Sequence, residues 1–145
     1  MHYTDSTQLP FPCRQMFDLV ADFERYPEFL PGWKHARILD RQDNRLYAEQ
    51  QLQAGPAVFH FHSTALLQPC SGIHISANDG PFRKMHIDWC FTPIDETHCR
   101  VTVELALVMR PGLMNGALKI LLETGSSQLL PLFEHRARVL YAQSV

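Results

Sequence analysis

The middle of the chain, residues 35–109, alternates apolar and polar side chains with a period of two, and short turn sequences interrupt the alternation. One such run places Met85 and Ile87 on one side and His86 and Asp88 on the other. A period of two puts neighbouring side chains on opposite faces of a strand, and short turns join strands that run antiparallel. The pattern therefore predicts an antiparallel sheet with one apolar face that another element must cover.

The residues before and after this predicted sheet have sequence patterns that differ from the sheet pattern and from each other. Residues 2–9 alternate weakly and predict a short first strand, which stops at two nearby prolines. Residues 113–142 are the only long stretch with helical periodicity, and we expect one long C-terminal helix there. The middle of this helix, Thr124 to Ser127, is poor in helix formers, and Pro131 removes a backbone donor, so we expect a bend or a break.

The segment between the first strand and the sheet, residues 16–33, carries more apolar surface than a loop needs. Its beginning has helical spacing, and the steps Tyr26-Pro27 and Leu30-Pro31 limit any second helix to a short one, because the residue before proline avoids helical geometry. Two interpretations compete. The segment closes a hydrophobic core, or it forms one wall of a cavity that an apolar ligand occupies.

These elements predict an α+β fold in one domain over residues 1–145. We expect a curved antiparallel sheet of about six to seven strands, two short helices after the first strand, and the long C-terminal helix across the concave face. A length of 145 residues with 46% hydrophobic content suits a single domain with a substantial core. If the sheet curls strongly, the space between sheet and helix is a cavity.

Charge and cysteine content restrict the partners and the compartment. The formal net charge of −2 argues against extended nucleic-acid binding, which needs clustered positive charge. Arg37, Arg41 and Arg45 form a local basic patch, although a solvated charged face explains them more simply. The four cysteines lack C-x-x-C and metal-finger spacing, which indicates free thiols. The sequence shows neither a signal peptide nor a membrane span, so we expect a cytoplasmic protein.

Three motifs carry a resemblance to a known family. Residues 17–31 read FDLVADFERYPEFLP, residues 79–83 read DGPFR, and residues 133–137 read FEHRA. Together they resemble the coenzyme Q-binding protein and ribosome-association toxin family of the START-like (polyketide cyclase) superfamily, whose members have the helix-grip (START/Bet v 1-like) fold. The chain departs from the usual family pattern at Gly32 and in the segment 109–128.

The resemblance implies binding of a hydrophobic small molecule, a polyprenylated quinone (ubiquinone) or a lipid, in the internal cavity, as a chaperone or carrier that supports respiration. No cofactor is expected beyond such a bound ligand. Phe29, Leu30 and Trp33 would touch the inner membrane to collect it. The expected ligand-binding residues come from the mouth, the sheet and the helix, and each has core packing as its simpler interpretation: Phe17, Val20, Tyr26, Phe29, Leu30, Trp33, Ile87, Trp89, Val103, Leu105, Leu107, Leu118, Leu121, Leu122, Leu129 and Phe133.

The resemblance leaves two other functions open. The family's ribosome-association toxins are described as binding the large ribosomal subunit and blocking subunit joining, and the basic patch would then contact RNA. Related helix-grip proteins include polyketide cyclases and aromatases, for which Gln50, Ser63 and Asp88 are candidate polar groups. We expect a binding protein rather than an enzyme, with no catalytic residues, because the chain has no G-x-S-x-G motif and no informative pair of carboxylates.

The histidines raise a metal hypothesis. His60 and His62 share one face of a predicted strand, and His74 and His86 oppose one another on the next hairpin. No carboxylate completes an obvious ligand set, and the two strand histidines alternate with apolar residues. We therefore expect them to line the polar face of the sheet and expect no metal site.

Overall fold

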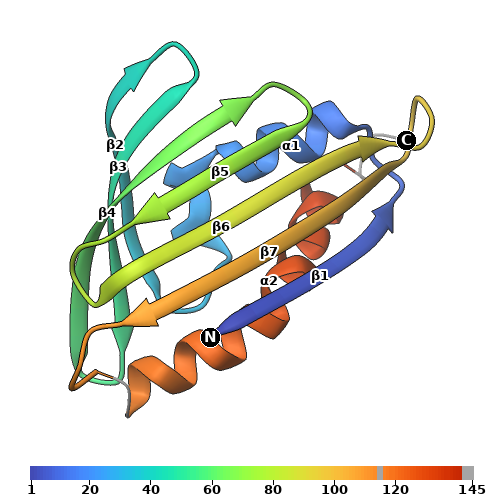
Figure 1. Ribbon diagram of the computed structural model, residues 1–145. Coiled ribbons are helices and arrows are strands. Elements are labelled where there is room, and N and C mark those ends of the chain that lie inside the picture. Colours follow the sequence, from blue (N-terminus) through green and yellow to red (C-terminus); the bar gives the residue numbers. More distant parts are fainter. Residues whose placement is uncertain (114–115, 142–145) are drawn as a thin grey trace.

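The computed structural model describes residues 1–113 and 116–141. Residues 114, 115 and 142, which fall inside the range expected for the C-terminal helix, lie outside the described residues. Figure 1 shows the elements, which follow one another in this order: β1 (His2–Leu9), α1 (Cys13–Ala21), the 3-10 helix η1 (Phe23–Glu28), β2 (Trp33–Gln42), β3 (Arg45–Ala54), β4 (Ala57–Gln68), β5 (Gly72–Ala77), β6 (Phe82–Pro93), β7 (Cys99–Met109) and α2 (Ala117–Tyr141).

All seven strands belong to one antiparallel sheet with the order β1-β7-β6-β5-β4-β3-β2. The sheet curls strongly, and α1, η1 and α2 lie on its concave side (Figure 1). The alternation of apolar and polar side chains along the strands explains why the helices cover one face of the sheet. In β3, for example, Leu46, Ala48, Gln50 and Leu52 are buried, while Tyr47, Glu49 and Gln51 between them are more exposed. The predicted curved sheet with two short helices and a long helix is confirmed, and the fold is the helix-grip fold.

Of the bend or break expected in the C-terminal helix, the break does not occur, because α2 continues through residues 124–131. Two serine side chains satisfy carbonyls in this region: Ser126 donates to the oxygen of Leu122 at 2.6 Å, and Ser127 to the oxygen of Thr124 at 2.9 Å. Beyond Pro131 the helix is seated by buried Phe133 and Ala137. Packing of this apolar stripe outweighs the weak local helix propensity.

The first and third sequence motifs meet in space and form what we call the aromatic clamp, which consists of Tyr26, Phe29, Phe133 and the ion pair Glu28–Arg136. The rings pack edge to face, with centroid distances to Phe133 of 5.5 Å from Tyr26 and 5.1 Å from Phe29. Arg136 Nη2 donates to Glu28 Oε1 at 2.7 Å, and its guanidinium lies 5.2 Å from the Phe29 ring centroid. The clamp therefore fixes η1 against the second half of α2.

Burial of Tyr26 inside this clamp raises its pKa well above the ordinary value, first by desolvation and then by the negative charge of Asp22. Its hydroxyl donates to the carbonyl oxygen of Val20, so the buried polar group has a partner. The proline inside η1, Pro27, is accommodated because this element is a short 3-10 turn rather than a long helix.

The second motif holds β4 where it leaves β5. The last paired residues are Thr64 and Ser76, and beyond them the backbone N–H of His62 donates to the carboxylate of Asp79 at 2.8 Å. Gly80 follows with φ +59°, and a Cβ there would lie 2.0 Å from the carbonyl oxygen of His60. Only glycine fits so close to another backbone. The turn after β5 thus replaces a strand partner for β4.

Candidate functional site

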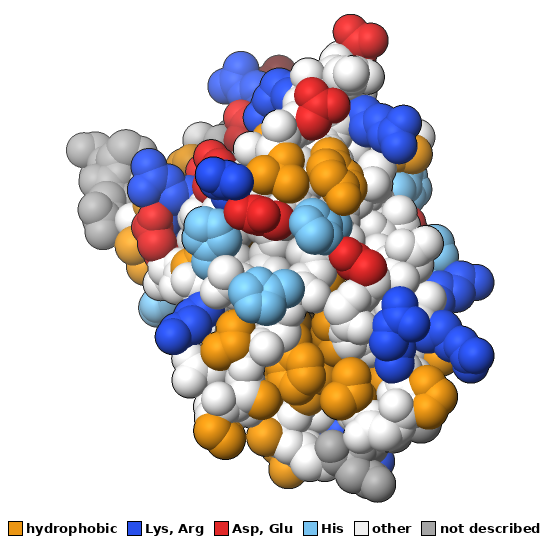
Figure 2. Space-filling view, turned by 90° about the vertical axis from the view of Figure 1, so that its left-hand side faces the viewer, with side chains coloured by type: hydrophobic (Ala, Val, Ile, Leu, Met, Phe, Trp, Pro, Cys, Tyr) orange, Lys and Arg blue, Asp and Glu red, His pale blue; other side chains and the backbone are white. Residues whose placement is uncertain are grey.

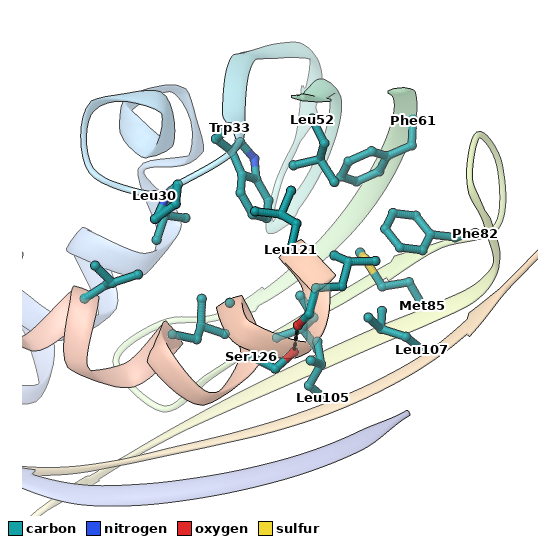
Figure 3. Close-up of a pocket in the computed structure, with 16 residues that line it drawn as sticks. Leu30, Trp33, Leu52, Phe61, Phe82, Met85, Leu105, Leu107, Leu121 and Ser126 are labelled. Carbon is teal, nitrogen blue, oxygen red and sulfur yellow. Dashed lines mark hydrogen bonds between the residues drawn. The ribbon is translucent and has the colours of Figure 1, made fainter. Parts of the chain in front are cut away.

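A cavity lies between the first half of α2 and the concave face of the sheet. Figure 3 shows its apolar side chains converging from several elements. Its volume is about 70 Å³. The lining residues are Leu30, Pro31, Trp33, Leu52, Phe61, Phe82, Met85, Ile87, Leu105, Leu107, Leu121, Leu122, Gly125, Ser126, Leu129 and Leu132.

Alternate residues of the strands form one wall of the cavity, and residues at helical spacing on α2 form the other. Leu52 on β3 and Phe61 on β4 occupy positions that point to the concave face, as do the lining residues of β6 and β7. From α2, Leu121, Leu122 and Leu129 recur at helical intervals and face the sheet. The loop before β2 and the first residue of that strand, Trp33, complete the wall.

Leu121 and Gly32 control how wide the cavity is beside Trp33. Figure 3 shows Leu121 reaching from α2 toward the Trp33 ring. Gly32 has φ +82°, and a Cβ at this position would lie 2.6 Å from Cδ2 of Leu121. The glycine that departs from the family pattern thus lets the first half of α2 come close and narrow the cavity.

The size of the cavity sets a condition on any ligand. Small-molecule sites typically measure about 300–1,000 Å³, whereas this one measures about 70 Å³. A molecule with more than a few heavy atoms can enter only if a wall moves. One wall, the first half of α2, lies outside the aromatic clamp; within it Leu118 is buried and Ile120 is 64% exposed.

The polar groups at the cavity are few and satisfied. The hydroxyl of Ser126 already donates to Leu122. Behind the wall, Trp33 Nε1 donates to Gln50 Oε1 and Gln50 Nε2 donates to Ser63 Oγ, both at 2.7 Å. Gln50 and Ser63 are each 4% exposed, so this hydrogen-bonded chain places a small polar region next to an otherwise apolar space.

The three polar residues considered for an enzyme do not converge. Gln50 and Ser63 lie on the concave side, as described above, but Asp88 lies on the opposite face of the sheet. There its Oδ1 is hydrogen-bonded to Nδ1 of His74 at 2.6 Å. Asp88 is thus not one of the residues that line the cavity.

Half of the predicted ligand-binding residues line the cavity, and half do not. Those on the wall are Leu30, Trp33, Ile87, Leu105, Leu107, Leu121, Leu122 and Leu129. The others pack in the core: Phe17, Val20, Tyr26, Phe29, Trp89, Val103, Leu118 and Phe133. Most of the second group belong to the aromatic clamp or lie near it. The segment 16–33 therefore mainly closes the core, and only its end, from Leu30 onward, reaches the cavity.

Sequence reasoning missed several lining residues, among them Leu52, Phe61, Phe82 and Met85. Leu52, Phe61 and Met85 occupy positions that strand alternation places on the apolar face. Phe82 faces the same side only because the strand register shifts between Phe82 and Lys84. The signal was therefore present, but it does not tell which end of the concave face α2 leaves uncovered.

The residues expected to touch a membrane have little surface to offer. Leu30 is 4% exposed, and Phe29 is held between Phe133 and Arg136. Trp33 faces the cavity. No helix in the described part of the chain is long and apolar enough to cross a bilayer.

The four histidines considered for a metal site, His60, His62, His74 and His86, lie on the outer face of the sheet. His62 is hydrogen-bonded to Asp79 and His74 to Asp88, at 2.7 Å and 2.6 Å between nitrogen and oxygen. Across residues 1–113 and 116–141, no group of three His, Cys, Asp or Glu side chains is arranged to hold a metal ion.

Comparison with known proteins agrees with this geometry. Residues 9–133 match the family described as polyketide cyclase / dehydrase and lipid transport. The chain is 31% identical over 140 residues to the ribosome association toxin RatA of Pseudomonas aeruginosa, covering 97% of each protein. It is 28% identical over 94 residues, 64% of this chain and 38% of the relative, to the coenzyme Q-binding protein COQ10 homolog B of Xenopus laevis.

Among solved structures, the Zhui aromatase/cyclase from Streptomyces sp. R1128 superimposes with a TM-score of 0.81. The alignment covers 100% of this chain and 99% of that one at 16% identity. At this identity, the likeness establishes a shared fold and leaves the chemistry of the site to its own residues.

Proposed function

This chain belongs to the polyketide cyclase / dehydrase and lipid transport family, within the group of ribosome association toxins and coenzyme Q-binding proteins, and on that premise we propose that it binds a hydrophobic small molecule in the cavity under the first half of α2. The ligand is a polyprenylated quinone or a similar lipid. The protein acts as its carrier or chaperone and supports respiration.

The observation that carries this proposal is the apolar lining of a space that a core of this size would otherwise fill. Protein interiors normally pack without voids larger than a water molecule. Here about 70 Å³ remain open among leucine, phenylalanine and methionine side chains, and the hydroxyl of Ser126 is turned back onto its own helix. Cavities with apolar walls favour apolar molecules over water.

The proposal also includes an orientation for the ligand. An isoprenoid tail lies against the leucines of α2 and β7, where each buried methylene contributes about 0.8 kcal/mol. The carbonyl of the quinone head lies toward Trp33, whose indole N–H belongs to the hydrogen-bonded chain with Gln50 and Ser63. The first half of α2 moves outward to admit the molecule.

A filled-cavity variant with a matched control tests this proposal. Leu129 lines the cavity, whereas Leu140 lies on the same helix and is exposed. We expect the protein to bind a short-chain ubiquinone in equilibrium dialysis and native mass spectrometry. Leu129→Trp should weaken that binding at least about tenfold, because the new ring occupies the space, and Leu140→Trp should leave it unchanged. Absence of binding by the unaltered protein, or equal affinities of the two variants, would contradict the proposal.

Ribosome association is a second candidate, favoured by the 31% identity to RatA over 97% of both chains. In this function the protein binds the large ribosomal subunit and blocks subunit joining. Sucrose-gradient profiles after overexpression test it. The fraction of joined ribosomes should fall and the protein should sediment with the large subunit. An unchanged profile without co-sedimentation would remove this candidate.

A further inference from the structure

The outer, convex face of the sheet carries a second concave site, which we call the outer groove. Its lining residues come from β3 to β6 and the turn after β5: Tyr47, His62, Thr64, Ser76, Ala77, Asn78, Asp79, Arg83, Lys84 and His86. Figure 2 views the molecule from the side of β2, β3 and β4, where histidine, lysine and arginine side chains lie among aspartate and glutamate side chains. The groove therefore differs in chemistry from the apolar cavity on the other face.

The groove exists because two neighbouring strands separate. Pairing between β4 and β5 ends at Thr64 and Ser76, and the turn that follows bonds to β4 through Asp79 instead of through a strand. Gly80 permits this close approach. The backbone contacts of Asp79 and Gly80 with β4 fix the shape of this hollow. The groove is therefore a feature of the backbone and does not depend only on side-chain rotamers.

The floor of the groove contains a flat aromatic platform. The rings of Tyr47 and His62 are stacked, with an interplanar angle of 8° and centroids 5.6 Å apart. His62 cannot turn freely, because its Nδ1 is hydrogen-bonded to Asp79 at 2.7 Å. Tyr47 is 40% exposed. The platform is thus both preorganised and accessible to a planar partner.

The rim of the groove is positively charged. Arg83 and Lys84 are exposed, and neither forms an ion pair with a described residue. Arg110 donates to the carbonyls of Gly80 and Asn78 at 2.8 and 3.0 Å, which brings a third cation to the same turn. Asp79 is the one carboxylate among the residues that line the groove, and it is already hydrogen-bonded to His62.

The arginine patch predicted from the sequence is less suited to bind an anion. Arg37 forms an ion pair with Glu49 at 3.2 Å, and His35 lies 3.5 Å from the same carboxylate oxygen. Asp40 and Asp43 add negative charge to that hairpin. Arg41 and Arg45 form no ion pair with a described residue either, but neither lines the outer groove. Arg83 and Lys84 do line it, together with the Tyr47–His62 platform.

We propose that the outer groove binds single-stranded RNA, with one base stacked on the Tyr47–His62 platform and the adjoining phosphates held by Arg83 and Lys84. Single-stranded RNA is commonly recognised by stacking on aromatic rings and by basic side chains along its backbone. The hydroxyls of Thr64 and Ser76 face the ribose. This inference rests on the second candidate function, ribosome association, and identifies the surface that performs it.

The groove and the cavity lie on opposite faces of the same strands, so the two sites can be separated by mutation. On β6, Met85 faces the cavity, while Lys84 and His86 line the groove. A change at Lys84 therefore removes a charge outside without altering the cavity wall. Arg100, exposed on β7 and paired in register with Thr92, provides a control cation on the sheet outside the groove.

Fluorescence anisotropy with a labelled single-stranded RNA of about 12 nucleotides, titrated at about 50 and 200 mM salt, tests the proposal. We expect the double variant Arg83→Gln/Lys84→Gln to bind about tenfold more weakly. Its slope of log affinity against log salt should be smaller by about 1.4, because two phosphate contacts are lost. Tyr47→Ala should weaken binding at least about fivefold with little change in that slope, because it removes stacking.

Arg100→Gln should bind like the unaltered protein, and a poly-glutamate of equal length should not compete with the RNA. The proposal is overturned if the unaltered protein does not bind this RNA, if the double variant and Arg100→Gln bind alike, or if poly-glutamate competes equally. Circular dichroism melting confirms that each variant is folded.

Sedimentation of the same variants separates this inference from the function it rests on. If the protein associates with large subunits and the double variant still does so, the groove assignment fails and ribosome association stands. If the protein binds RNA through the groove but leaves ribosome profiles unchanged, ribosome association fails and the groove remains an RNA site.

Discussion

The two halves of α2 are one continuous helix, yet they serve different purposes. The second half is fixed, since Leu130, Phe133 and Ala137 are at most 1% exposed and the aromatic clamp holds them against η1 and the sheet. The first half covers a cavity and leaves Ile120 64% exposed. Rigid attachment at one end and loose cover at the other allow a single helix to anchor the fold and to admit a ligand.

The difference also explains where the family motifs lie. The first and third motifs make up the clamp, whereas most of α2 that faces the cavity belongs to the segment 109–128, which departs from the family pattern. The conspicuous aromatic residues of the motif thus hold the helix, and the less regular segment shapes the space for the ligand. A motif that identifies a fold need not contain its binding site.

The largest expected effect comes from removing the centre of the clamp. Phe133→Ala should lower the free energy of unfolding by about 3–5 kcal/mol, because the ring is 1% exposed and contacts Tyr26, Phe29 and Trp89. Leu121→Ala in the first half should cost only about 1–2 kcal/mol, because Leu121 already borders a cavity. Urea unfolding measures both. Equal losses would erase the proposed difference between the halves.

The second prediction concerns Gly32, which lies against Leu121 in the first half of α2. Gly32→Ala should destabilise the protein by about 2–3 kcal/mol, because the left-handed φ of +82° is unfavourable for alanine and its Cβ would lie 2.6 Å from Leu121. In a Leu121→Ala background the cost should fall to about 1–2 kcal/mol, because only the backbone strain remains. A double-mutant cycle from urea titrations measures this coupling. If the two substitutions have additive effects on the free energy of unfolding, then Leu121 of α2 does not pack against Gly32.

A third change should make the first half of α2 more stable. Gly125 lies within α2, and a Cβ there would have no atom within 4 Å. Gly125→Ala should therefore stabilise the protein by about 0.5–1 kcal/mol through the lower flexibility of the unfolded chain. Thermal unfolding measures the gain. If the first half must move to admit ligand, stopped-flow quinone binding should be slower in this variant, and an unchanged rate would argue for a different entrance.

The smallest effect concerns pH. Hydrogen bonds from Arg25 and Arg136 hold the pKa of Glu28 below its ordinary value. A lowered folded-state pKa contributes stability above the unfolded value, about 4.3, and that contribution disappears as the pH falls through the folded-state pKa. Glu28→Gln should thus lower the melting temperature slightly at neutral pH, and the difference from the unaltered protein should vanish in acid.

Glu123→Gln provides the control for this pH effect in the first half of α2. Its ion pair with Lys119 is longer, 3.7 Å, and exposed, so its removal should change the melting temperature little at any pH. A pH-dependent loss in Glu123→Gln as large as that in Glu28→Gln would show that both halves depend on surface ion pairs.

Much of the fold could be predicted from sequence because it follows from local periodicity. Alternation located the strands, and helical spacing located α2. The uninterrupted course of α2 could not be predicted, since Gly125 and Pro131 favour a break locally and only contacts of Leu130 and Phe133 with distant elements outweigh this preference. Local propensity cannot report on such contacts.

The candidate site was predictable to a smaller extent. Ile87, Leu105 and Leu107 were found because alternation shows which strand residues face inward. The sequence predicts Phe29 and Tyr26 as ligand contacts, but both pack on Phe133, more than 100 residues later in the chain. Whether an inward residue meets a ligand or another side chain depends on how far α2 stands from the sheet, and no local pattern encodes that distance.

The void under the first half of α2 also makes the protein sensitive to hydrostatic pressure. Unfolding eliminates such internal space, and the volume decrease on unfolding scales with the void volume that is lost. Compression should therefore act first where the interior is hollow and spare the densely packed clamp. A bound lipid would fill the void and make the molecule stiffer, so pressure resistance is itself a measure of occupancy.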